Sequence, residues 1–306
     1  MESKQITGNT RFMGMLLAFG AVVLWGLLPL YWKLLKEIPA DEILAHRVFW
    51  SCAFLFCILA YQKKLSDIKK VAENKKNLLI VAVGAVTISI NWGLYIWSVN
   101  SDYLVEASMG YYINPLVVVT LATVVLKEKL NKWQAVSIMA AAVGVVILTI
   151  QYGQVPWVSL MLAISFALYG LCKKLAKADS LTGLMLETLL LMPIALGYIL
   201  FKEYHGIGSL RVVPFNTLMI LFLAGVATAT PLMMFGEAAK RIPLSVMGFF
   251  QYVTPTISLI LGVFLYHEEF TRTHFISFGF IWAGLLLFSL SQIAGMKKLQ
   301  PEELHS

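Results

Sequence analysis

The chain has 306 residues, of which 59% are hydrophobic and 13% charged, and its mean hydropathy is +0.77. Soluble globular domains carry about 45–50% apolar and about 25% charged residues, so this composition excludes an ordinary soluble enzyme, a disordered chain and a disulfide scaffold. The three cysteines, Cys52, Cys57 and Cys172, lie inside apolar runs, which argues against a disulfide framework. The composition predicts an all-α membrane protein.

A membrane-spanning helix needs roughly 20 mostly apolar residues, and the sequence predicts ten such helices. The first is longer than the roughly 7–15 residues of a signal-peptide core, so we expect it to be retained. In chain order, the ten runs lie at 13–35, 42–61, 77–98, 103–126, 133–150, 156–176, 182–201, 215–238, 243–266 and 273–295.

Lysines and arginines are distributed unequally between the two sets of loops. The set that includes both termini holds 18 of them, and the opposite set holds five, with Arg47 left inside the second run. Since cytoplasmic loops carry the excess of positive charge, both termini are expected in the cytoplasm. The net charge of +7 is therefore an orientation signal and does not indicate nucleic-acid binding.

The largest loop, 62–76, carries six lysines and also places Leu65, Ile68 and Ala72 at helical spacing. Two interpretations fit this pattern. The segment is either a helix lying on the anionic inner leaflet or a solvated basic linker.

The two halves of the chain share a repeat with an offset of 140 residues. It pairs Tyr112, Pro115, Leu121, Glu128, Ser137 and Gly144 with Tyr252, Pro255, Leu261, Glu268, Ser277 and Gly284. The halves are then 13–150 and 156–295, with five helices each, followed by a cytoplasmic tail at 296–306. Because five is odd, the second half must enter the membrane from the opposite side, as in the inverted repeats of secondary transporters.

Pro115 and Pro255 each fall near the middle of a predicted helix, where proline removes a helical hydrogen bond. Matching kinks in the two halves would shape a central cavity. An aromatic cavity with a few amides and hydroxyls suits a small organic solute. The candidate cavity residues on the third, fourth and ninth runs are Asn91, Trp92, Tyr95, Glu106, Tyr111, Tyr112, Asn114, Gln251 and Tyr252.

Ionisable residues inside spans are costly, so they face a partner or a wet cavity. The candidates are His46, Arg47, Glu187 and Glu237, in addition to Glu106. Arg47 and Glu106 both fall toward the outer ends of their helices and could pair in the cavity. Long side chains that snorkel to the interface are the alternative. His46, Glu187 and Glu237 are candidates for coupling or for ion pairs.

The sequence contains no zinc-protease motif, no nucleophile elbow and no phosphate-binding loop. We therefore predict no enzyme activity, no metal site, no cofactor and no ATP-driven step. A secondary transporter, exporting a small organic solute by alternating access, is the leading hypothesis. A non-transporting membrane scaffold or assembly factor is the alternative.

Several phrases resemble a known family. They are Trp25-Gly26, 29–33 (PLYWK), 45–51 (AHRVFWS), 109–116 (MGYYINPL) with Lys127-Glu128, and 243–256 (PLSVMGFFQYVTPT). Together they resemble the RarD branch of the EamA transporters, in the drug/metabolite transporter superfamily. The resemblance implies a ten-helix permease of the inner membrane that exports a metabolite, amino acid or drug. The implied partners are the solute, the bilayer and either a proton or a counter-solute.

The charge asymmetry generates a topological prediction. Cysteines introduced at Lys70 and Lys298 should react with impermeant maleimides only from the cytoplasmic side, and one at Glu269 only from outside. Labelling of the Lys70 and Glu269 positions from the same face would end the inverted-repeat interpretation.

Overall fold

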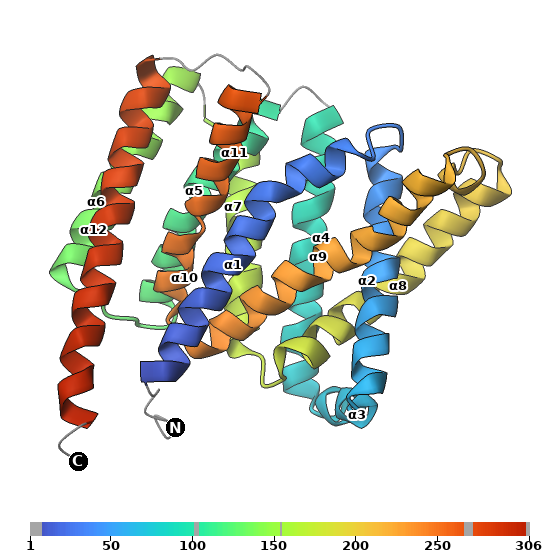
Figure 1. Cartoon of the computed structure of the whole chain (residues 1–306), viewed down its shortest axis with the longest axis horizontal. Coiled ribbons are helices and arrows are strands. Elements are labelled where there is room, and N and C mark those ends of the chain that lie inside the picture. Colours follow the sequence, from blue (N-terminus) through green and yellow to red (C-terminus); the bar gives the residue numbers. More distant parts are fainter. Residues whose placement is uncertain (1–7, 101–103, 154, 266–271, 304–306) are drawn as a thin grey trace.

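A computed structural model of the chain describes residues 8–100, 104–153, 155–265 and 272–303 (Figure 1). All regular structure in these ranges is helical, as predicted. The first half contains α1 (Gly8–Lys33), α2 (Ala40–Tyr61), α3 (Leu65–Glu73), α4 (Lys75–Asn100), α5 (Leu104–Val124) and α6 (Lys132–Tyr152). The second contains α7 (Trp157–Leu175), α8 (Ser180–Tyr204), the short 3₁₀ helix η1 (Ser209–Arg211), α9 (Phe215–Arg241), α10 (Leu244–Phe250), α11 (Val253–Leu265) and α12 (Arg272–Glu303).

The predicted spans are confirmed. Within the described ranges, nine helices are long and apolar enough to cross a bilayer, counting α10 and α11 together, and Met109–Val124 is a shorter apolar stretch in α5. Helix α1 begins and α12 ends at the same face, the lower one in Figure 1, as an even number of crossings requires. We call this the N-terminal face.

Two boundaries differ from the prediction. The ninth span is not one continuous helix, because it is interrupted between α10 and α11 at Gln251 and Tyr252. Helix α12 continues to Glu303, through the segment predicted as a tail. Residues of the largest loop form α3, whose side chains are all at least partly exposed.

The helices pack in matching pairs. Helix α1 packs on α9 while α4 packs on α7, and these are equivalent pairs under the 140-residue offset. Helices α2 and α8 contact each other, and so do α6 and α12, each pair consisting of a helix and its own repeat mate. An approximate twofold axis therefore passes between α2 and α8 and between α6 and α12.

At the crossing of α6 and α12, small residues bring the two backbones together. A Cβ added to Gly144 would lie 2.5 Å from the carbonyl oxygen of Ser277, and one added to Gly284 would lie 2.7 Å from that of Ser137. The same contact thus occurs twice: a glycine of α6 packs against a serine of α12, and a glycine of α12 packs against a serine of α6. In lipid, where the hydrophobic effect does not drive helices together, such a close approach stabilises the helix pair through van der Waals contacts.

A second close crossing joins α2 to α9. A Cβ on Gly225 would overlap the backbone of Trp50 and Ser51, and the Ser51 hydroxyl donates a 3.0 Å hydrogen bond to the Gly225 carbonyl. This crossing fixes the position of α2 beside the centre of the bundle.

The α6–α12 crossing predicts different effects for two glycines of the same helix. Gly284→Ala should lower the melting temperature in detergent by several degrees, because relieving a backbone clash costs about 1–3 kcal/mol. Gly279→Ala should leave it unchanged or raise it, since no atom lies within 4 Å of a Cβ at that position. Equal melting temperatures for the two variants would contradict the crossing.

Candidate functional site

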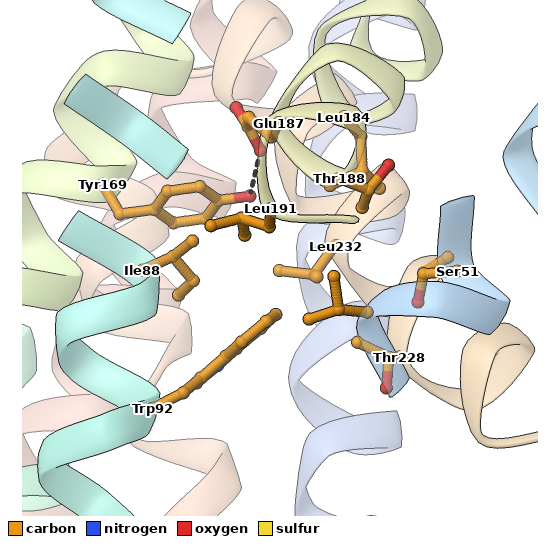
Figure 2. A pocket seen from close by; sticks show the side chains of 12 residues that line it. Ser51, Ile88, Trp92, Tyr169, Leu184, Glu187, Thr188, Leu191, Thr228 and Leu232 are labelled. Atoms are coloured by element: carbon orange, nitrogen blue, oxygen red, sulfur yellow. Dashed lines mark hydrogen bonds between the residues drawn. The ribbon is translucent and has the colours of Figure 1, made fainter. Parts of the chain in front are cut away.

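A small cavity of about 10 Å³ lies between α2, α4, α7, α8 and α9 (Figure 2). A volume of roughly 10–15 Å³ is what a single water needs. The cavity is therefore closed to any organic molecule in this conformation, and an organic ligand can enter only if the helices move apart.

The cavity lies on the approximate twofold axis. Eight of its twelve lining residues are repeat mates of one another. These pairs are Val48 and Thr188, Ser51 and Leu191, Ile88 and Thr228, and Trp92 and Leu232. Both halves thus build the wall from equivalent positions, although with different side chains.

At one end of the cavity, Glu187 on α8 lies beside Tyr169 on α7 (Figure 2). The Tyr169 hydroxyl donates a 3.3 Å hydrogen bond to Glu187 Oε2. Lys173 Nζ lies 2.8 Å from the same oxygen, and the two charged side chains are only 4% and 5% exposed. The carboxylate therefore has a buried counter-ion supplied by the protein.

At the opposite end are Trp92 and Thr228, which connect the cavity to Arg47 on α2. Arg47 Nε donates a 2.9 Å hydrogen bond to Thr228 Oγ1. Its guanidinium carbon lies 4.6 Å from the ring centre of Trp32 and 4.9 Å from that of Trp92, both in cation–π range. Among the side chains that the structure describes, no carboxylate lies within 4.0 Å of this guanidinium.

Two predicted tyrosines lie near Arg47, although neither lines the cavity. The rings of Tyr95 on α4 and Tyr111 on α5 are 6.2 Å apart in an edge arrangement. Both phenol groups are close enough to Arg47 to interact with it electrostatically. The side chain of Glu106, the predicted partner of Arg47, lies outside the described part of the structure.

Three further candidates bond to residues that do not line the cavity. Asn91 donates to the Leu162 carbonyl at 2.9 Å and to Ser165 Oγ at 3.0 Å, which joins α4 to α7. His46 Nδ1 accepts a 3.3 Å hydrogen bond from Trp50 Nε1. Glu237 pairs with Arg241 one turn later at 2.7 Å, near the N-terminal face.

The remaining candidates lie between α5 and the interruption of the ninth span, away from the cavity. Asn114 Nδ2 donates to Gln251 Oε1, while Asn114 Oδ1, Gln251 Nε2 and the Tyr252 hydroxyl are buried with no hydrogen-bond partner in the described structure. Tyr112 packs edge-on against Phe278, with ring centres 5.1 Å apart.

The two prolines are not equivalent in this conformation. Helix α5 continues through Pro115, whereas Pro255 lies in the first turn of α11, directly after the interruption. Proline is tolerated in a first turn because the amide hydrogen that it lacks would have no helical partner there.

Polar contacts between the two halves close the bundle at the N-terminal face. The carboxylate of Glu128, which follows α5, accepts hydrogen bonds at the start of α10. Its donors are the amide of Leu244 at 2.8 Å, the amide of Ser245 at 3.0 Å and the hydroxyl of Ser245 at 2.7 Å.

A second group of contacts joins the halves at the opposite face. Glu42 on α2 accepts a 2.9 Å hydrogen bond from the amide of Ser209. Lys202 Nζ on α8 lies 3.4 Å from Glu42 Oε1 and 3.7 Å from Asp41 Oδ2. Contacts that join one half to the other therefore occur at both faces.

Sequence reasoning missed Lys173, Thr228 and Trp32 as members of the site. Lys173 belongs to a basic pair at a helix end, which resembles an ordinary interfacial anchor. The sequence could have predicted that Arg47 and Glu187 occupy equivalent positions, because they are separated by the 140-residue offset of the repeat.

The buried ion pair predicts a non-additive effect on stability. Lys173→Met should destabilise the protein by about 3–5 kcal/mol, because it leaves Glu187 without its counter-ion. The double variant Lys173→Met/Glu187→Leu should recover most of this loss, as seen in detergent melting curves. Lys202→Met is the control, since its pair is more exposed and its loss should be smaller. A double variant no more stable than Lys173→Met would contradict the pairing.

The comparisons with known proteins agree with this architecture. The EamA-like transporter family matches residues 12–150 and again 155–290. An uncharacterized transporter of Bacillus subtilis, YojE, is 49% identical over 89% of this chain and 91% of its own length. Protein RarD of Streptomyces exfoliatus is 42% identical over 91% and 89%, and protein RarD of Escherichia coli is 38% identical over 96% and 97%.

A protein crystal structure with 20% sequence identity aligns with a TM-score of 0.69, covering 92% of this chain and 98% of the other. This likeness shows the shared fold. The two family matches and the relatives along nearly the whole chain show more: the chain is a multi-pass membrane protein that belongs to the EamA-like transporter family, in its RarD branch.

Proposed function

We propose that the protein is a secondary transporter that exports a small organic solute by alternating access at the central cavity. The observation that carries this proposal is the small cavity on the approximate twofold axis, walled by equivalent positions of both halves. In transporters built from inverted repeats, the substrate site lies at the interface of the repeats near the midplane.

The contacts at the two faces suggest how access alternates. Opening toward the N-terminal face requires separation of Glu128 from the start of α10. Opening toward the other face requires separation of Glu42 from Ser209 and Lys202. Because the segments 13–150 and 156–295 are related by inversion, rocking one against the other can open either face about the same centre.

The distribution of lysines and arginines indicates the orientation of the transporter in its membrane. We place it in the cytoplasmic membrane with both termini inside, since the set of loops that includes the termini carries 18 lysines and arginines in the sequence and the opposite set carries five. A proton or a counter-solute would supply the driving force, with no catalytic step.

Disulfide locks at the two faces test this proposal in proteoliposomes. In a background without native cysteines, Glu128→Cys/Ser245→Cys should lock the N-terminal face, and Asp41→Cys/Lys202→Cys the other. The wild type should accumulate or exchange at least one solute from a panel of amino acids, nucleobases and amphiphilic drugs. Oxidation should stop transport by either double variant, and a reductant should restore it.

The single-cysteine variants are the controls and should not respond to oxidation. If the wild type moves no solute in the panel, the scaffold hypothesis gains weight. If a lock forms in mass spectra of oxidised protein while transport continues, alternating access between these faces is wrong.

A further inference from the structure

Arg47 and Glu187 occupy equivalent positions of the two repeats, because they are separated by 140 residues. Glu187 lines the cavity, and Arg47 contacts Thr228 and Trp92 of the cavity wall. The two charged groups differ in their partners. Glu187 has Lys173 as a buried counter-ion at 2.8 Å. Arg47 has no carboxylate within 4.0 Å among the described side chains. Among the described side chains, the positive charge of Arg47 is therefore not compensated by a carboxylate.

An uncompensated charge inside a span is costly, and such residues face a partner or a wet cavity. The contacts of Arg47 meet only part of its requirements. Within the described structure, its Nε bond to Thr228 is the one hydrogen bond that it makes, so the fork of terminal amino groups has no acceptor there. The two indole rings attract the guanidinium but accept no conventional hydrogen bond from it.

The contacts of Arg47 place its side chain next to the cavity wall. Thr228 and Trp92, which both contact Arg47, line the cavity at the end away from Glu187 (Figure 2). The surrounding surface is aromatic and aliphatic, with Trp92, Ile88 and Leu232 on the cavity wall and Tyr95 close to the guanidinium. A molecule held there would meet one cation and an otherwise largely apolar wall.

We propose that the cavity recognises a small organic monocarboxylate, whose carboxylate binds the terminal amino groups of Arg47 and whose apolar body packs on Trp92. This inference rests on the proposed transport function and names its substrate class. A planar guanidinium matches a carboxylate with two parallel hydrogen bonds. One uncompensated positive charge selects a monoanion, since a second negative charge would have no partner once Glu187 is paired with Lys173.

The test compares ligands that differ only in charge. Purified protein in detergent is titrated with benzoate, phenylacetate, indole-3-acetate and hexanoate, each alongside its neutral amide, and binding is measured as a rise in melting temperature. At least one carboxylate should bind tenfold or more tightly than its amide. If no acid is preferred over its amide, the proposal is overturned.

Variants assign the preference to one residue. Arg47→Gln should abolish the preference for the acid over the amide, and Arg47→Lys should weaken it at least fivefold, because lysine keeps the charge but loses the planar fork. Arg241→Gln is the matched control, since Arg241 already has Glu237 as its partner, and it should bind like the wild type. Full carboxylate preference in Arg47→Gln would overturn the assignment even if that variant melts at a lower temperature.

Transport measurements separate this proposal from the one on which it rests. Uptake of a neutral or cationic solute by proteoliposomes, unchanged in Arg47→Gln, would leave the transporter standing and remove the anion site. Carboxylate binding that depends on Arg47, without movement of any solute across the bilayer, would support the anion site and contradict the transport proposal.

Discussion

Charge inside an apolar slab must be compensated, and the centre of this protein is organised around that requirement. The ion pair of Lys173 and Glu187 is almost completely buried, and its two residues come from neighbouring helices, α7 and α8. Removing two charges from water is expensive unless their geometry is good and further hydrogen bonds are made. Tyr169 supplies one of these hydrogen bonds and also lines the cavity, so the compensation of Glu187 and the shape of the cavity depend on the same side chains.

The inverted repeat gives this centre its position. Glycine and serine bring α6 and α12 into backbone contact on the twofold axis, and the cavity is walled by repeat mates on the same axis. Equivalent positions differ in chemistry, since Ser51 corresponds to Leu191 and Trp92 corresponds to Leu232 under the 140-residue offset. The scaffold is therefore approximately symmetric while the lining of its central cavity is not.

Local features of the sequence were sufficient for the architecture. Ten apolar runs, a fixed offset of 140 residues and the phrases around Pro115 and Pro255 led to a ten-span, two-repeat transporter fold, which the helices and the family matches confirm. Hydropathy predicts spans reliably because every backbone polar group in lipid must be bonded within its own helix. The interruption at Gln251 could not be predicted in the same way, because the Tyr-x-x-Pro spacing that surrounds it also occurs in α5, which is continuous.

What the sequence determined by itself was the number of spans, their pairing into repeats and the presence of costly charges such as Arg47 and Glu187. Tertiary structure alone decided which groups those charges meet. Lys173 reaches Glu187, Thr228 reaches Arg47, and Asn91 bonds across to α7. The reason is geometric: successive residues of a helix are about 100° apart around its axis, so the partner of a buried side chain depends on the rotation and crossing of neighbouring helices, which hydropathy does not encode.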